Sequence, residues 1–221
     1  MAAISNRRFI LPILIACSFA TGLFFGLVAK GLLSSSGWAE ALSGIATVVA
    51  LILAVVTYIG WHKQKIREDA YSTKKLYIST LVQIESTTVQ IANLLFNLVP
   101  EAGMLVPSDS QAKSNLEKVV DKNNELKLYT QSLTSVNSEL GFWGASLSQD
   151  SAVEHVKLMD SINEYLTSLH YLHNCLINFY VHKSNDITIQ QWKTRSIEAN
   201  KTIFDLFNSR KRKSMSTVFL D

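Results

Sequence analysis

The stretch from Trp38 to Val99 limits the possible folds of this chain more than any other feature. Its first part, residues 38–60, is apolar and exceeds the length of about 20 residues that a helix needs to cross a bilayer. Its second part, residues 61–99, is polar but keeps a helical spacing of apolar residues, and no proline follows until Pro100. The pattern predicts one continuous helix, about 90 Å long at about 1.5 Å per residue, that leaves a membrane and enters a soluble region.

A second apolar stretch, residues 9–29, lies upstream and is preceded by Arg7 and Arg8. A cleavable signal is an alternative, because the residues ending at Cys17 look like the lipidation site of a bacterial lipoprotein. The apolar run continues well beyond Cys17, however, whereas a lipoprotein usually becomes polar there. We therefore expect residues 1–60 to form a transmembrane hairpin with spans at about 9–29 and 38–60.

The charges that flank these two stretches predict the orientation of the hairpin. Basic residues precede the first span and follow the second, whereas the connecting loop carries only Lys30. The positive-inside rule then places both termini in the cytoplasm, joined by a short outside loop. The basic residues that follow the second span most closely are His62, Lys63, Lys65 and Arg67.

The remaining charge is nearly balanced. Of the 21 basic and 18 acidic residues, three bases and one acid precede residue 61, which leaves 18 and 17 for the soluble part. A broad nucleic-acid-binding face is therefore not expected. Cys17 and Cys175 fall in different regions, so no disulfide framework is predicted, in keeping with a reducing cytoplasm.

Small residues recur every four positions in both predicted spans, a spacing that lets helix backbones approach closely in lipid. The two stripes either pack against each other within one hairpin, or at least one of them packs against another copy and builds a homo-oligomer. The middle of the spans carries no charged residue of the kind that forms proton or ion pathways. The stripe residues are Ser18, Gly22 and Gly26 in the first span and Ala46, Ala50 and Ala54 in the second.

The soluble part predicts an all-α fold, an antiparallel bundle of about four helices over residues 77–213. The chain after Trp61 is charged on all sides, which leaves residues 61–70 no face to bury and predicts a juxtamembrane neck that extends over residues 61–76. From Tyr77 onward, apolar residues alternate three and four apart, which is the spacing of packed helices. Helices are expected to start at capping boxes at Ser151 and Thr188, and at Ser114 or a few residues earlier. The expected seam of the first helix is Tyr77, Leu81, Ile84, Thr88, Ile91, Leu95 and Leu98.

The sequence carries no pattern typical of an enzyme. It contains neither a phosphate-binding glycine loop nor a G-x-S-x-G nucleophile. His170 and His173 lie one helical turn apart, but a metal site needs more converging ligands, so a hydrogen-bonded core histidine is favoured. We expect no enzyme activity, no metal, no cofactor and no small-molecule substrate.

Two segments are candidate contact points. Phe142 and Trp143 lie between two glycines, either tucked onto the bundle end or exposed to a partner or a membrane surface. The tail, residues 214–221, follows a basic run that either complements a helix C-terminus or binds the phosphates of anionic lipid or nucleic acid. Its apolar residues are a candidate docking segment for another protein. The basic residues are Arg210, Lys211, Arg212 and Lys213, and the apolar ones are Val218, Phe219 and Leu220.

The layout of spans at 9–29 and 38–60 followed by a helical body at 61–221 resembles the small two-transmembrane effectors of bacterial anti-phage systems, including those paired with retrons. The resemblance covers the whole chain and depends on the layout, without a specific motif. It implies a protein held silent by a cytoplasmic partner, such as a reverse transcriptase with its nucleic acid. Release would let the spans assemble and perturb the inner membrane, by a pore or by depolarisation, in abortive infection. The alternative is a membrane-tethered scaffold or sensor that binds a cytoplasmic protein without membrane damage.

Overall fold

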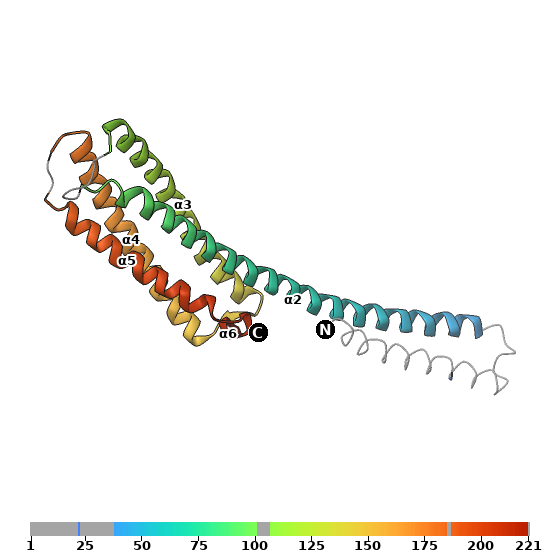
Figure 1. The fold of residues 1–221 in the computed structure, drawn as a ribbon. Coiled ribbons are helices and arrows are strands. Elements are labelled where there is room, and N and C mark those ends of the chain that lie inside the picture. Colours follow the sequence, from blue (N-terminus) through green and yellow to red (C-terminus); the bar gives the residue numbers. More distant parts are fainter. Residues whose placement is uncertain (1–21, 23–37, 101–106, 185–186, 221) are drawn as a thin grey trace. The chain divides into compact units, whose positions relative to one another are not determined.

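The computed structural model describes residue 22 and residues 38–100, 107–184 and 187–220. These residues are predominantly helical, which confirms the all-α prediction (Figure 1). An unpredicted pair of two-residue strands, β1 (Ser146–Leu147) and β2 (Phe219–Leu220), is antiparallel, with Ser146 opposite Leu220. The helices are α2 (Trp38–Phe96), α3 (Asp109–Phe142), α4 (Gln149–Tyr180), α5 (Ile189–Lys211) and the short α6 (Met215–Val218).

The chain divides into two compact units, residues 1–66 and 67–221, and helix α2 contributes to both. In the first unit, α2 is long and apolar enough to cross a membrane. Its most apolar window of 18 residues has a mean hydropathy of 2.2, and none of that window is buried. Exposed apolar side chains in this part include Val48, Leu51, Ile52, Val55 and Ile59.

The small-residue stripe of the second predicted span lies on this apolar part of α2. Ala46, Ala50 and Ala54 are exposed there. Gly22 is helical, and a Cβ atom built on it would meet nothing within 4 Å. The other stripe residues, Ser18 and Gly26, lie outside the described residues together with the remainder of the first predicted span.

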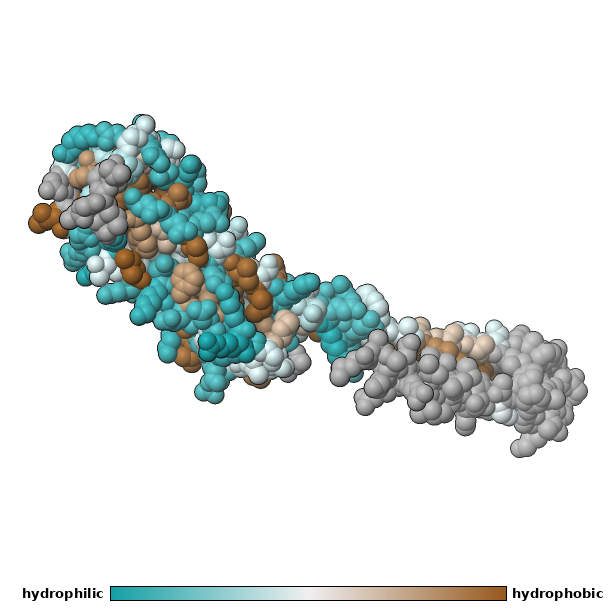
Figure 2. All heavy atoms as spheres, viewed as in Figure 1, coloured by the Kyte–Doolittle hydropathy of each residue, from teal (hydrophilic) through white to brown (hydrophobic). Residues whose placement is uncertain are grey.

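The second unit packs the C-terminal part of α2 with α3, α4 and α5 around one hydrophobic core (Figure 1). The visible face of these helices is mostly hydrophilic, with scattered apolar side chains (Figure 2). All seven residues of the predicted α2 seam are buried, as the alternating three- and four-residue spacing requires. The other helices supply most of the remaining core, including Leu126, Leu133 and Leu140 from α3, Leu158, Ile162 and Leu169 from α4, and Ile203 and Phe207 from α5.

Burial in the second unit starts before Tyr77, within the predicted neck. Ala70, Thr73 and Lys74 are already buried on α2. The hydroxyl of Thr73 bonds the Asp69 carbonyl, four residues earlier, at 3.0 Å. These contacts let a polar helix enter the core without an unpaired hydroxyl group.

Two helices start at residues other than the predicted capping boxes. Helix α4 begins at Gln149, two residues before Ser151, and its N-cap is Ser148, whose hydroxyl accepts from the Ser151 backbone N–H at 3.4 Å. The prediction of Ser151 as N-cap is therefore wrong, and the reason is that Ser151 is completely buried inside the first turn. Helix α3 begins at Asp109, which is the earlier of the starts that the sequence allowed.

We predict that Leu133→Ala destabilises the second unit by about 2–5 kcal/mol, because it deletes a completely buried side chain and leaves a cavity. Chemical unfolding of the full chain in detergent, followed by circular dichroism, measures this loss. Leu128→Ala is the matched control, since Leu128 lies on the same helix with 64% of its surface exposed. Equal losses for the two variants would contradict the assigned core.

Candidate functional site

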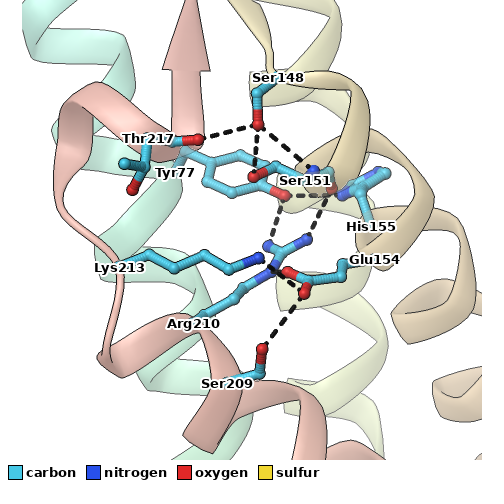
Figure 3. Close-up of polar contacts among 9 residues, drawn as sticks. All are labelled: Tyr77, Ser148, Ser151, Glu154, His155, Ser209, Arg210, Lys213 and Thr217. Atoms are coloured by element: carbon cyan, nitrogen blue, oxygen red, sulfur yellow. Dashed lines mark hydrogen bonds and ion pairs between the residues drawn. The ribbon is translucent and has the colours of Figure 1, made fainter.

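A buried polar cluster surrounds Arg210, in the last turn of α5 (Figure 3). Only 7% of the Arg210 surface is exposed, although its guanidinium group keeps its charge at every physiological pH. A buried charge is tolerated only when acceptors and opposite charges surround it. The surrounding side chains are Tyr77 of α2, Ser151, Glu154 and His155 of α4, and Lys213 just after α5.

Two nitrogens of the Arg210 guanidinium group donate hydrogen bonds, and the third, Nε, has an ion-pair contact without a hydrogen bond. Nη1 donates to the Tyr77 hydroxyl at 2.8 Å, and Nη2 donates to the Ser151 carbonyl at 3.0 Å. Nε lies 3.5 Å from Oε2 of Glu154, an ion-pair distance. The guanidinium also lies over the Tyr77 ring, 5.7 Å from its centroid, where the ring quadrupole attracts a cation. Arg210 thus ties the end of α5 to both α2 and the first turns of α4.

Glu154 is the acidic member of the cluster. Its Oε1 accepts from Lys213 at 2.8 Å and from the Ser209 hydroxyl at 3.2 Å. Burial acts to raise the pKa of Glu154, but the hydrogen bonds and charges of Lys213, Ser209 and Arg210 together outweigh it. The pKa therefore lies below its ordinary value of 4.5, and the group stays ionised at neutral pH.

Tyr77 links Arg210 to His155. The Tyr77 hydroxyl lies 2.8 Å from Nδ1 of His155. Arg210 can only donate, so the phenol oxygen accepts from it. The phenol proton has Nδ1 as its acceptor when the neutral imidazole carries its own proton on Nε2. Burial and the Arg210 charge both lower the pKa of His155, which favours this neutral form.

The residues after α5 return along the same end of the second unit. The Ser148 hydroxyl donates to the Thr217 carbonyl at 2.9 Å, and the Ser148 N–H donates to the Val218 carbonyl at 2.9 Å. Val218 and Phe219 are buried, and the Phe219 ring meets the edge or face of Tyr77 at a centroid distance of 5.7 Å and an angle of 84°. We call residues 212–220 the C-terminal strap. The strap covers the same tyrosine that Arg210 holds.

The predicted basic run is largely paired within the chain. Besides Arg210 and Lys213, Lys211 forms an ion pair with Glu85 of α2 at 2.6 Å. Arg212 is exposed, and its backbone N–H donates to the Arg210 carbonyl at the end of α5. A phosphate-bearing partner of this run would have to compete with Glu85 and Glu154.

Some of the predicted docking residues of the tail are also buried within the chain's own fold. Val218 and Phe219 are covered by the chain's own fold, whereas Leu220 is about half exposed. In the aromatic loop, 78% of the Phe142 surface is exposed. Trp143 is half-buried, and its ring N–H donates to Glu139 at 3.1 Å. Phe142 and Leu220 are therefore the predicted contact residues that a partner can reach.

The two histidines considered for a metal site, His170 and His173 of α4, lie apart from this cluster, and His173 is the one predicted to lie in the core. His170 is exposed and its Nε2 lies 3.2 Å from the Asn174 amide nitrogen. His173 is half-buried, and burial lowers its pKa. Among the described residues, no group of three or more His, Cys, Asp or Glu side chains is placed to hold a metal ion.

The sequence pattern contains a signal for this cluster that the predicted seams left out. Arg210 follows Ile203 and Phe207 at intervals of four and three, so it lies on the buried face of α5. Ser151 and His155 precede Leu158 at the same intervals. If polar residues at these intervals are counted as part of a buried seam, Arg210, Ser151 and His155 are predicted to lie in the core.

Comparisons with known proteins add no assignment: no protein-family model, curated protein or solved structure matches this chain.

We predict that Tyr77→Phe lowers the unfolding free energy of the second unit by about 1–3 kcal/mol, because it leaves Arg210 Nη1 and His155 Nδ1 buried without this partner. Urea unfolding of the full chain in detergent measures the change. Tyr71→Phe is the control, because Tyr71 lies on the same helix and is 60% exposed. A Tyr77→Phe variant as stable as this control would show that the cluster does not stabilise the fold.

Proposed function

We propose that this chain is a membrane-anchored, non-enzymatic effector that perturbs the bacterial inner membrane when its helical unit is released from a silent state. The proposal depends on one observation, which is that the two parts of α2 have different surroundings. One part of this helix is apolar and exposed, and the other part forms a wall of the core. A change in the packing of the second unit therefore acts on the helix that carries the apolar segment.

The contacts of the second unit support a silent state that depends on packing. Tyr77 and Glu85 of α2 are held by Arg210 and Lys211 at the far end of the sequence. These ion pairs and hydrogen bonds are reversible, and another anionic or hydrogen-bonding partner can replace them. A cytoplasmic protein partner that binds this unit, with or without nucleic acid, would bias the equilibrium between the packed and released states.

The remaining parts of the proposal come from the flanking charges and from the resemblance to anti-phage effectors. Both termini are assigned to the cytoplasm, and the output is assigned to assembly of the spans through the small-residue stripes. The resulting pore or depolarisation would stop growth of an infected cell, as in abortive infection. The competing function is a membrane-tethered scaffold or sensor that binds a protein and leaves the membrane intact.

We expect regulated expression of the full chain in a bacterial host, without its partner, to collapse the membrane potential. Substitution of stripe residues with leucine should abolish this effect, because the added bulk separates helices that pack closely in lipid. A potential-sensitive dye and growth curves provide the measurement. The test variants are Gly22→Leu with Gly26→Leu, and separately Ala50→Leu.

Val48→Leu is the matched control, since it adds bulk to the same exposed segment at a position outside the stripe. It should depolarise the membrane as the wild type does. Normal growth and potential at high expression of the wild type would reject the effector and favour the scaffold. Equal loss of effect in Val48→Leu would show that the stripe has no special role.

A further inference from the structure

The hydrogen bonds that join Arg210, Tyr77 and His155 have one arrangement in which the phenol proton finds an acceptor. Arg210 Nη1 donates to the Tyr77 oxygen, which is the only role open to an arginine. The Tyr77 hydroxyl lies 2.8 Å from His155 Nδ1 and donates to it when Nδ1 carries no proton. If Nδ1 carries a proton, the Tyr77 oxygen faces two donors and its own proton loses this acceptor.

We propose that His155 is a proton-sensitive switch whose protonation releases the C-terminal strap, residues 212–220, from Tyr77. A protonated imidazole carries an N–H on both nitrogens. The Tyr77 oxygen would then face donors from both Arg210 and His155, and its own proton would lose its acceptor. Two positive charges would also lie on either side of one buried phenol.

Protons reach His155 from solvent. His155 lines an open pocket of about 310 Å³ on the surface of the second unit. The pocket walls are mainly small or apolar, so the imidazole is the only side chain among them that titrates near neutral pH. The other lining residues are Asn137, Gly141, Ala145, Ser146, Leu147, Ala152 and Val156.

Among the described residues, no acidic side chain forms a hydrogen bond or an ion pair with His155. Tyr77 faces it from α2, and the charge that acts on it from α5 is the positive charge of Arg210. On α4, Glu154 already pairs with Arg210 and with Lys213. The α3 and β1 residues that share its pocket are uncharged.

The same residues hold the strap. The Phe219 ring packs against Tyr77, and the Lys74 ammonium lies 5.7 Å from the Phe219 centroid. Arg210 bonds the Ser151 carbonyl in the turn that Ser148 caps, and Ser148 holds Thr217 and Val218. Displacement of Tyr77 or Arg210 therefore removes one wall of the strap's binding surface. Release would also free Lys213 and Arg210 to act with Arg212 as an exposed basic segment.

The direction of the pH dependence follows from the neutral imidazole in the docked state. Burial and Arg210 lower the pKa of His155 below its ordinary value of 6.5, so the docked state binds fewer protons than the released state. Docking is then unaffected well above pH 6.5 and weakens as the pH falls below it. Protonation of Glu154 affects docking only at lower pH than that of His155, because the lowered pKa of Glu154 keeps it ionised until below pH 4.5.

Hydrogen–deuterium exchange of the full chain in detergent at pH 7.5 and 5.5 tests the switch. Exchange is expressed as protection relative to the intrinsic rate at each pH, with α4 peptides as the internal reference. One pH unit below the ordinary pKa, the expected loss of protection in peptides covering the strap is up to roughly tenfold. Equal protection at the two pH values would overturn the proposal.

His155→Asn keeps an acceptor near the position of Nδ1 and cannot take up a proton, so its strap should stay protected at both pH values. His173→Asn, on the same helix, should keep the wild-type response. A pH response in His155→Asn equal to that of the wild type would reject His155 as the switch.

If the strap of His155→Asn is open at both pH values, ¹⁵N spectra of the histidines in the wild type show which ring nitrogen of His155 carries the proton, and this result tests the proposal. A proton on Nδ1 at pH 7.5 would overturn the proposal, and a proton on Nε2 that gives way to the doubly protonated ring over the range of strap release would support it. The test reads strap docking alone, so its outcome is separate from that of the membrane-potential experiment.

Discussion

The burial of the Arg210 guanidinium is the constraint from which much of the second unit follows. Arginine cannot lose its proton inside a protein, so its environment has to supply acceptors and negative charge. Tyr77, the Ser151 carbonyl and Glu154 supply them from two other helices. Each acceptor fixes one element relative to α5, and Glu154 in turn needs Lys213 to offset its own burial. The geometry around one cation thus sets the register of α2, α4 and α5 at this end of the core.

Helix α2 combines two different sequence patterns. Its first part is apolar and long enough to cross a membrane, and its second part alternates apolar residues at intervals of three and four. The change occurs over a few turns of polar residues, and Ala70 and Thr73 are among the first to be buried. Because the helix is unbroken over these turns, no loop separates the apolar segment from the core.

Sequence periodicity predicted the helices and most of the core, because Tyr77, Ile84 and Leu95 follow a rule that depends only on local spacing. It failed where long-range partners decide the role of a residue. Arg210 and Lys211 form a conspicuous basic run, yet their partners Tyr77 and Glu85 are more than 120 residues away in sequence. The strands β1 and β2 are two residues each, too short to leave a periodic pattern. Ser151 has a residue type typical of an N-cap, but it lies buried in the first turn of α4, and Ser148, three residues earlier, is the N-cap.

The distance along the chain between Tyr77 and Arg210 has a consequence for biosynthesis. The two residues are 133 positions apart, so at a translation rate of about 5–20 residues per second roughly 7–27 s separate their appearance. During that interval every nascent copy exposes an uncovered Tyr77 on a helix whose apolar segment has already been made. Each new molecule therefore exists first without the contact between Tyr77 and Arg210. A binding partner that is present at the ribosome can bind the chain before this contact forms.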